Sequence, residues 1–312
     1  MRSAQRRKLA EERKQKGRLY GLFFKVFLPI ILIIGLLIII RSDTKYWNAQ
    51  DKFILAYRLE SGEVAVSVLD PKLDELTTLL VPGDTEVDVA RNYGELRIKN
   101  VWQLGINEGA GGSLLAETVS QNFLFPVFLW SDSDAKSLAD GSLPGILHFI
   151  VFPKSTNIAL GDRFSAGLFA LRVNNSGRGL IDLGKNQFLL KQKLTDGQSG
   201  FVLGGPISPR LTVYFSDNYI SDANSGGNLK VVIKDTTGVP GVADKVGQIV
   251  EVMGGKVVSV EKKNSDSSDC LVLGTDHRVV KKIADLFSCK TGGSRGEMDL
   301  EIDLGASFAR RF

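Results

Sequence analysis

Residues that commonly bind metals through nitrogen or sulfur are scarce, since the 312-residue chain contains only two cysteines and two histidines. Cys270 and Cys289 lack the close spacing of zinc ligands, and His148 and His277 are isolated. Neither histidine stands in a recognisable nucleophile context. The sequence therefore predicts neither a zinc site nor a Ser-His-Asp triad, and we interpret both histidines as structural or surface residues.

Signals for phosphate-loop and nucleic-acid binding are also missing. The Gly-rich stretch 109–112 is not followed by Lys and Ser or Thr, as a phosphate-binding loop requires. The net charge of +4 is concentrated in residues 1–18, which carry eight Lys and Arg against two Glu. The rest of the chain has 31 basic and 33 acidic residues, so no basic face for nucleic acid is predicted.

The sequence does contain one long apolar run, Gly21 to Ile40. Its 20 residues would form a helix about 30 Å long, which matches the hydrocarbon thickness of a bilayer. Lys25 lies near the start of the run, where its stem can reach back to the headgroups. Ile38 to Arg41 offers no small residues for signal-peptide cleavage, so we predict an uncleaved signal anchor.

Charge predicts the orientation of this anchor. Eight cations precede it and few follow it, which places the N-terminus in the cytoplasm and residues 42–312 outside. We therefore predict a single-pass protein of the cell membrane, with the lipid bilayer as a partner. The predicted parts are a basic tail (1–20), a membrane anchor (21–40), a linker (41–51), a central domain (52–215), a second linker (216–228) and a C-terminal domain (229–308).

The fold class predicted for the part outside the membrane is α/β (α+β). Hydrophobic alternation and turn residues predict strands, whereas the apolar spacing after Gly112 predicts a helix that begins near Ser113 as its N-cap. The strands predicted for the central domain are Phe53–Leu59, Val64–Leu69, Leu76–Val81, Gly145–Phe152, Gly167–Val173 and Leu211–Phe215.

The C-terminal region has the clearest pattern, with the order β-α-β-β-α-β. This order is typical of the ferredoxin-like split βαβ arrangement or a close relative. Strands are predicted at Leu229–Asp235, at 256–263, at 270–276 and at Met298–Gly305, with amphipathic helices at 242–253 and 277–287. The last residues, 307–312, are expected to fray.

Cys270 starts a predicted strand, and Cys289 follows the next predicted helix. A helix packed on its own sheet returns antiparallel to the preceding strand, so the two ends can meet. A disulfide is the favoured interpretation, and two buried free thiols are the alternative.

The C-terminal sequence resembles the LytR C-terminal domain. Gly238-Val239-Pro240-Gly241 matches the turn into the first helix of that domain, and residues 303–308 resemble its final strand. The central region is similar to the LytR–CpsA–Psr domain that often precedes this module. Its Asp70-Pro71 turn, its Pro82-Gly83-Asp84-Thr85 segment and its Arg97-to-Asn100 stretch stand where that domain has comparable elements.

The resemblance implies a cell-envelope protein, since active members transfer glycopolymers from a polyprenyl pyrophosphate carrier to the cell wall. Such members hold the pyrophosphate with arginines and place Mg²⁺ with acidic residues. In this chain Gly83 replaces the arginine of Pro-Arg-Asp, and residues 60–62 replace an Arg-x-Asp. The candidate catalytic residues that remain are Asp84, Arg97 and Lys99, with Asp84 also the candidate for Mg²⁺. The alternative interpretation is a turn residue for Asp84 and exposed strand charges for the other two.

Three functions are consistent with these patterns. The first is a non-catalytic envelope protein that binds or scaffolds, with cell-wall glycopolymer or another envelope protein as its partner. The second is a diverged phosphotransferase that uses arginines from other positions, such as Arg91, Arg97 and Arg163, and requires Mg²⁺. The third treats the central domain as a spacer that holds the C-terminal module away from the membrane.

Overall fold

The computed structural model describes residues 44–186, 188–205, 209–216, 229–293 and 299–312, together with Lys25, Phe27 and Gly35. The predicted basic tail, nearly all of the predicted anchor, and the second predicted linker after Ser216 lie outside these residues. None of the helices in the described part is long and apolar enough to span a bilayer. The membrane anchor and the localisation of the protein therefore stay predictions.

The central domain is built around a mixed five-stranded sheet with the order β6-β1-β2-β3-β7. β1, β2 and β3 pair antiparallel as a meander, whereas β6 and β7 add to its two edges in parallel. The strands are β1 (Phe53–Arg58), β2 (Val64–Asp70), β3 (Glu75–Val81), β6 (Leu129–Ser131) and β7 (Arg178–Asp182). The first three are the strands that the sequence predicts.

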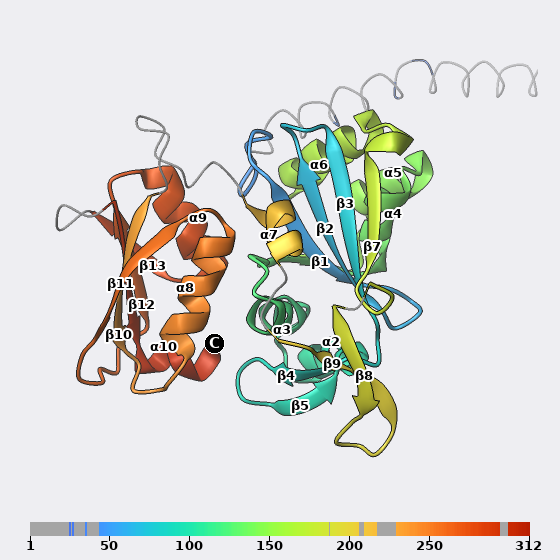
Figure 1. Cartoon of the computed structure of the whole chain (residues 1–312). Helices are drawn as coiled ribbons and strands as arrows, with labels where there is room; N and C mark the ends of the chain where they lie inside the picture. The colour runs from blue at the N-terminus through green and yellow to red at the C-terminus, as the bar shows by residue number, and fades with distance from the viewer. Residues whose placement is uncertain are drawn as a thin grey trace, which may run out of the picture.

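Helices cover both faces of this sheet (Figure 1). Alternate residues of β1 point to opposite faces, so that Ile54 packs with one core and Leu55 with the other. All residues of β2 are buried because both faces are covered. One face carries α4 (Lys136–Asp140), α5 (Leu143–Val151) and α6 (Leu160–Arg172), and the other carries α2 (Ile98–Asn107) and α3 (Ser113–Phe123).

Two hairpins extend the face that α2 and α3 cover. A bridge between Thr85 and Phe201 joins the chain before the first hairpin to the second hairpin. The hairpins are β4 (Glu86–Val89) with β5 (Gly94–Arg97), and β8 (Leu189–Lys193) with β9 (Ser199–Leu203). The second hairpin lies at the opposite end of the central domain from α5 and α6 (Figure 1).

Three of the predicted strands are wrong, because residues 145–151, 167–172 and 211–215 lie in the helices α5, α6 and α7 (Pro209–Phe215). Short continuous apolar runs do not distinguish a buried strand from a buried helix. Glycine is a poor helix former, yet Gly167 lies inside α6. It is tolerated in α6 because a Cβ there would lie 2.7 Å from Ile150 Cδ1, so only glycine lets α5 and α6 approach this closely.

The helices α2 and α3 differ from the sequence interpretation in two details. α2 follows β5 directly and was not predicted, although its apolar residues Ile98, Val101 and Trp102 have helical spacing. α3 begins at Ser113 as predicted, but its N-cap is Gly112. The Ser113 hydroxyl instead donates a hydrogen bond to the carbonyl of Ala110 at 2.7 Å.

Residues 44–51 are part of the central domain rather than a linker, which corrects the sequence interpretation. The carboxylate of Asp162, fully buried in the first turn of α6, accepts hydrogen bonds from the backbone N–H groups of Lys45, Tyr46 and Trp47 at 3.0–3.3 Å. Trp47 is 3% exposed and packs against Phe53 and Phe169. Burial raises the pKa of Asp162 despite these donors.

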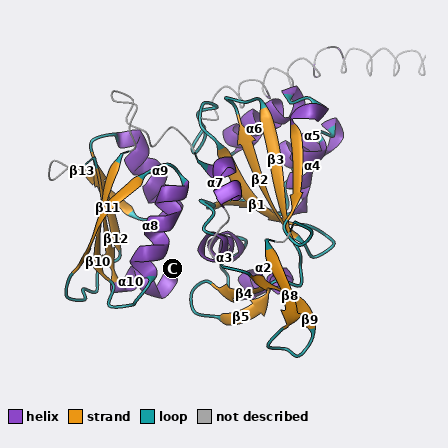
Figure 2. Cartoon of the chain, viewed as in Figure 1, coloured by secondary structure: helices purple, strands orange, loops and turns teal. Residues whose placement is uncertain are grey.

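The C-terminal domain has the predicted element order, with one additional strand and a short final helix, and α8 and α9 cover one face of its sheet (Figure 2). Its elements are β10 (Lys230–Thr236), α8 (Val242–Val252), β11 (Lys256–Lys262), β12 (Cys270–Gly274), α9 (His277–Phe287), β13 (Lys290–Gly293), β14 (Leu300–Gly305) and α10 (Ala306–Arg311). The bounds of α9 agree with the prediction at both ends.

The predicted split βαβ arrangement is wrong, because the strand order is β11-β10-β14-β12-β13. β10 and β11 are direct parallel neighbours, whereas in the split arrangement another strand lies between them. The final strand β14 instead inserts between β10 and β12, parallel to the first and antiparallel to the second. Element order alone does not determine which strands become neighbours.

The last residues of the chain do not fray. They form α10, in which Phe308 is fully buried and stacks on Phe312 with ring centroids 5.0 Å apart. The guanidinium of Arg311 donates to Asp269 at 3.0 Å. The ring of Phe287 packs against both Phe308 and Phe312, and these three rings close one end of the domain core.

Cys270 and Cys289 form a disulfide, with their Cα atoms 4.9 Å apart. Cys270 opens β12 and Cys289 follows α9, so the bond joins the strand to the returning end of the next helix. This is the pairing that the antiparallel helix return favours.

The helices of the C-terminal domain face the central domain (Figure 2). Leu124 and Phe128 of the central domain pack against the C-terminal core, and Val252 of α8 belongs to the central core. The Lys281 ammonium of α9 also donates to the carbonyl of Lys45 at 2.9 Å. The segment after the predicted anchor therefore contacts both domains.

Candidate functional site

The three candidate residues lie together. The Lys99 ammonium is 2.6 Å from Asp84 Oδ1, and Arg97 Nη1 is 2.7 Å from the same oxygen. Arg97 also contacts Asp196 through two nitrogens, at 2.6 and 3.1 Å. We call Asp84, Arg97, Lys99 and Asp196 the charge cluster.

A turn, the end of a strand and the start of a helix position the first three residues of the charge cluster. Asp84 lies in the turn after β3, where the N–H of Thr85 donates to the carbonyl of Pro82 at 3.0 Å. Arg97 ends β5, and Lys99 lies in the first turn of α2. The N–H of Lys99 donates to the carbonyl of Gly83 at 3.2 Å, which fixes the helix start against the turn.

The cluster's charges compensate one another. Lys99 and then Arg97 hold the pKa of Asp84 below its ordinary value, and Arg97 does the same for Asp196. These carboxylates in turn raise the pKa of Arg97. Two cations and two carboxylates make the cluster neutral, so an anionic ligand would have to displace a carboxylate to reach Arg97.

Sequence reasoning missed Asp196. It lies between β8 and β9, and 99 residues separate it from Arg97. The Asp196-Gly197 pair is a turn signal, but nothing in the sequence connects this turn with the β5–α2 junction. The interpretation of Arg97 as an exposed strand charge is also wrong, because its side chain is only 10% exposed, and Lys99 is helical.

The other arginines considered as pyrophosphate ligands do not join the cluster. Arg91 forms two hydrogen bonds of 2.7 Å with Glu117 of α3. Arg163 lies in α6, on the other face of the sheet, and donates to the carbonyl of Phe149 at 3.2 Å. The predicted set of Arg91, Arg97 and Arg163 is therefore not brought together.

Arg172 and Arg178 also have structural partners. Arg172 pairs with Asp74 at the surface. Arg178 donates to backbone carbonyls at the ends of α4 and α6, where helices leave such groups without an internal partner. Burial lowers the pKa of Arg178.

The two positions that depart from the LytR–CpsA–Psr pattern touch each other. A Cβ placed on Gly83 would lie 2.5 Å from the carbonyl oxygen of Gly62, within the segment 60–62 that replaces the Arg-x-Asp. The Gly62 turn thus occupies the space that a side chain at position 83 would need. The two departures in sequence therefore lie in contact in this structure.

This contact makes a testable prediction for Gly83→Ala. Because the Gly62 backbone cannot yield as a flexible side chain would, we expect a loss of about 1–3 kcal/mol in the free energy of unfolding. Gly179→Ala, whose Cβ would lie 3.4 Å from Thr77 Oγ1, is the control within the same domain. Urea unfolding of both variants measures the difference, and equal stability of the two would contradict the clash.

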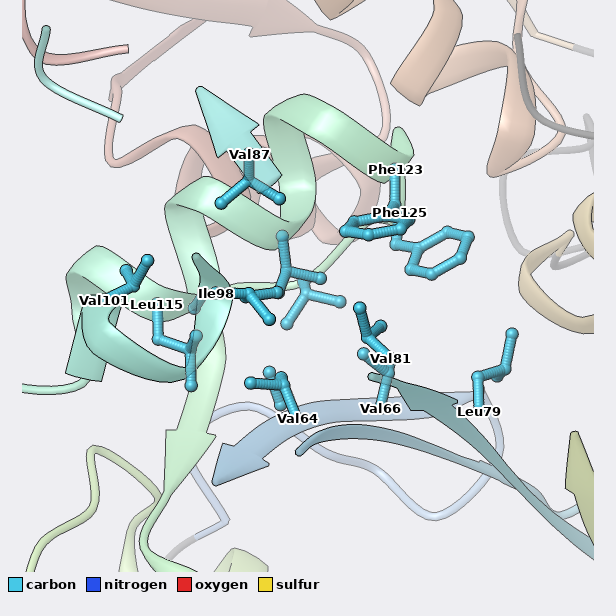
Figure 3. Packing of buried hydrophobic residues seen from close by; sticks show 14 of the residues in the cluster. Val64, Val66, Leu79, Val81, Val87, Ile98, Val101, Leu115, Phe123 and Phe125 are labelled. Carbon is cyan, nitrogen blue, oxygen red and sulfur yellow. The ribbon is translucent and has the colours of Figure 1, made fainter. Parts of the chain in front are cut away.

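Apolar side chains fill the space between the sheet and the helices α2 and α3. Val64, Val66, Leu79 and Val81 of the strands point toward Ile98, Val101, Leu115, Phe123 and Phe125 on the opposite side (Figure 3). Phe125 stacks on Phe215 with centroids 4.3 Å apart. This layer is a packed core in the described part of the protein, and the charge cluster lies at its edge.

The two carboxylates of the charge cluster are already paired with cations. Arg97 and Lys99 both contact Oδ1 of Asp84, and Arg97 contacts both oxygens of Asp196. In the described ranges, no group of three or more His, Cys, Asp or Glu is arranged to hold a metal ion. Mg²⁺ needs several oxygen ligands, and two paired carboxylates do not supply them.

A second candidate site is a cavity of about 320 Å³ between the two domains, which we call the interdomain pocket. The segment 44–54 forms one wall, and α9 forms another. Its aromatic side chains include Tyr46 and Phe128, whose rings meet edge to face at 5.2 Å. Its lining carries five cations and two carboxylates: Lys45, Lys52, Arg278, Lys281, Lys282, Asp51 and Asp285.

The chain is similar to several solved structures, among them the LytR–CPS2A–psr family protein YwtF (TagT). TagT of B. subtilis is 12% identical with a TM-score of 0.37, over 53% of this chain and 91% of that one. A structure of YwtF (TagT) with bound octaprenyl pyrophosphate lipid is 15% identical with a TM-score of 0.33, over 53% and 89%. The protein gbs0355 of Streptococcus agalactiae is 11% identical with a TM-score of 0.36, over 54% and 86%.

No protein-family model and no curated protein sequence matches the chain. At these identities and TM-scores, the similar structures carry no argument about ligands or activity.

Proposed function

We propose that this is a membrane-anchored, extracytoplasmic cell-envelope protein that binds an anionic cell-wall glycopolymer without transferring it. The internal neutralisation of the charge cluster is the observation that carries the non-catalytic part. Arg97 forms ion pairs with Asp84 and Asp196, and Lys99 forms one with Asp84. Their positive charges are therefore neutralised within the protein and do not face a pyrophosphate. Gly83 and the Gly62 turn also leave no room for another arginine beside them.

The interdomain pocket supports the binding part of the proposal. A concave site with aromatic walls and several polar groups is typical of ligand binding. Its five cations outnumber its two carboxylates, and although Lys52, Arg278 and Lys281 pair with Asp70, Asp276 and Asp285, a small net positive charge remains, which favours a ligand with negative charge. Sugar rings can pack on the aromatic walls while phosphate or carboxylate groups face the lysines.

The binding test uses the full chain in detergent and a purified anionic wall glycopolymer as the probe. Arg278→Ala with Lys281→Ala removes two exposed cations of the pocket. We expect affinity to fall tenfold or more, which is about 1.4 kcal/mol. Raising the salt concentration should weaken binding of the wild type as well.

The matched control removes two exposed cations of the same domain from β11, away from the pocket lining, by Lys256→Ala with Lys262→Ala. It has the same net charge as the pocket variant and should bind almost as the wild type does. Equal loss in both variants would show nonspecific attraction and would contradict a ligand site in the pocket. Detectable transfer of glycopolymer from a polyprenyl pyrophosphate donor by the wild type would refute the non-catalytic proposal.

A diverged phosphotransferase is the second candidate, and the convergence of Asp84, Arg97 and Lys99 favours it. That function requires the donor pyrophosphate to replace the carboxylate partners of Arg97. It predicts Mg²⁺-dependent pyrophosphate binding that Arg97→Ala weakens tenfold or more, about 1.4 kcal/mol. Arg172→Ala, which removes a surface arginine paired with Asp74, is the control. Equal pyrophosphate binding by the wild type and Arg97→Ala would discard this function.

A further inference from the structure

Two packed helices of the central domain carry apolar side chains on their outer side. In α5, Ile146, Phe149 and Ile150 are buried, whereas three other apolar residues recur outside at four-residue spacing. Together with Phe152 and two leucines of α6, they form what we call the α5–α6 apolar face. The face consists of Leu143, Leu147, Val151, Phe152, Leu168 and Leu171, which are between 41% and 68% exposed.

This pattern is unusual for a helix exposed to water. A surface helix normally has one apolar stripe and a polar opposite side, whereas α5 is apolar nearly all round. His148 is the one polar side chain that α5 exposes, and its Nδ1 lies 3.3 Å from Asp134. Exposed apolar patches of this kind mark contact with another protein or with a membrane.

The two helices form a fixed unit. Gly167 of α6 lies against Ile146 and Ile150 of α5, so closely that a Cβ at position 167 would clash with both side chains. Arg163, in the first turns of α6, donates to the carbonyl of Phe149 near the end of α5 at 3.2 Å. The C-terminal end of α5 therefore lies beside the first turns of α6.

The start of α6 also holds the chain where it leaves the predicted membrane anchor. Asp162 accepts from the backbone of residues 45–47, and residue 45 follows the predicted span by only five residues. Five residues extend over at most about 18 Å. If the span is in the bilayer, the first turn of α6 is held close to the outer headgroups.

We propose that the α5–α6 apolar face lies in the interfacial layer of the outer leaflet, so that the membrane itself covers it. The inference rests on the predicted anchor, which belongs to the proposed function. Apolar helix faces enter this layer to a depth of about 5–10 Å. Phe152 and the exposed Lys154 suit it, because aromatic rings and lysine stems span the boundary between headgroups and chains.

The face orients the domain rather than anchoring it. The anchor already keeps the face at high effective concentration near the lipid, so a weak contact is sufficient. With α5 and α6 on the membrane, the β8–β9 hairpin at the opposite end of the central domain points toward the wall (Figure 1).

A depth measurement with the full chain in liposomes tests this arrangement. Both native cysteines are in the disulfide, so a thiol-reactive, polarity-sensitive fluorophore labels only an introduced cysteine. Leu147→Cys places the label on the face, and Leu190→Cys in β8 is the control. The two leucines are matched in exposure, at 53% and 54%.

The label at position 147 should show blue-shifted emission and lose intensity when the liposomes contain lipids with a quencher in the upper acyl chain. The label at position 190 should show neither effect. A protein that resists carbonate extraction but shows no quenching at position 147 overturns the inference and leaves the anchor intact. Disulfide-linked dimers through Leu147→Cys without quenching also overturn it, since a second copy then covers the face. Release of the protein by carbonate overturns the inference together with the proposed function.

Discussion

Trp47→Ala is expected to lower the free energy of unfolding of the central domain by about 3–5 kcal/mol, the usual cost of emptying a large aromatic site in a core. The ring is 3% exposed between Phe53 and Phe169, and its indole N–H donates to the carbonyl of Asp51 at 2.6 Å. Urea unfolding followed by the fluorescence of Trp102 and Trp130 measures the change, since these are the remaining tryptophans.

Gln50→Ala is the control for this prediction, because Gln50 is exposed in the same segment. We expect it to change stability by less than about 0.5 kcal/mol, as is usual for surface substitutions. A loss of under about 1 kcal/mol in Trp47→Ala would mean that residues 44–51 behave as the linker that the sequence suggested.

This segment shows where sequence reasoning failed. Asp51, Asn48 and Lys45 give residues 41–51 the polar composition of a linker. Its structure depends on Asp162, more than 100 residues later, whose buried carboxylate collects three backbone N–H groups. A side chain that satisfies backbone groups at such a distance leaves no local pattern.

Where local patterns were strong, the prediction was accurate. The helix 277–287 has charged residues on one side and apolar residues on the other, and its bounds agree with the structure. The meander β1–β3 was predicted because turn residues separate its strands. The strand prediction for residues 145–152 failed because α5 exposes apolar residues on its outer side. The sequence therefore lacks the polar stripe that would have identified a helix.

The candidate site was predicted in part. Asp84, Arg97 and Lys99 were chosen separately by resemblance, and the turn after β3 and the start of α2 bring them together. Neither the ion pair between Arg97 and Asp196 nor the contact between Gly62 and Gly83 was predictable from the sequence. Both depend on the packing of loops that are distant in the sequence.

Loss of the disulfide is expected to destabilise the C-terminal domain by about 3 kcal/mol, since the bond closes a short loop and limits the unfolded chain. Cys270 and Cys289 are 19 residues apart, and the bond holds the end of α9 to the start of β12. The strands β13 and β14 flank β12 and both pair with it, so the position of β12 sets their register. The whole edge of this sheet should therefore open more often.

Hydrogen exchange measures this effect best, because the described part of the C-terminal domain contains neither Trp nor Tyr. After reduction, or in Cys270→Ser with Cys289→Ser, amides of β12 and α9 should exchange faster while those of β1 and β2 keep their rates. Adding reductant to the double variant is the control and should change nothing further. Unchanged exchange in β12 after complete reduction would mean that packing around Phe287 and Phe308, rather than the covalent link, holds α9 on its sheet.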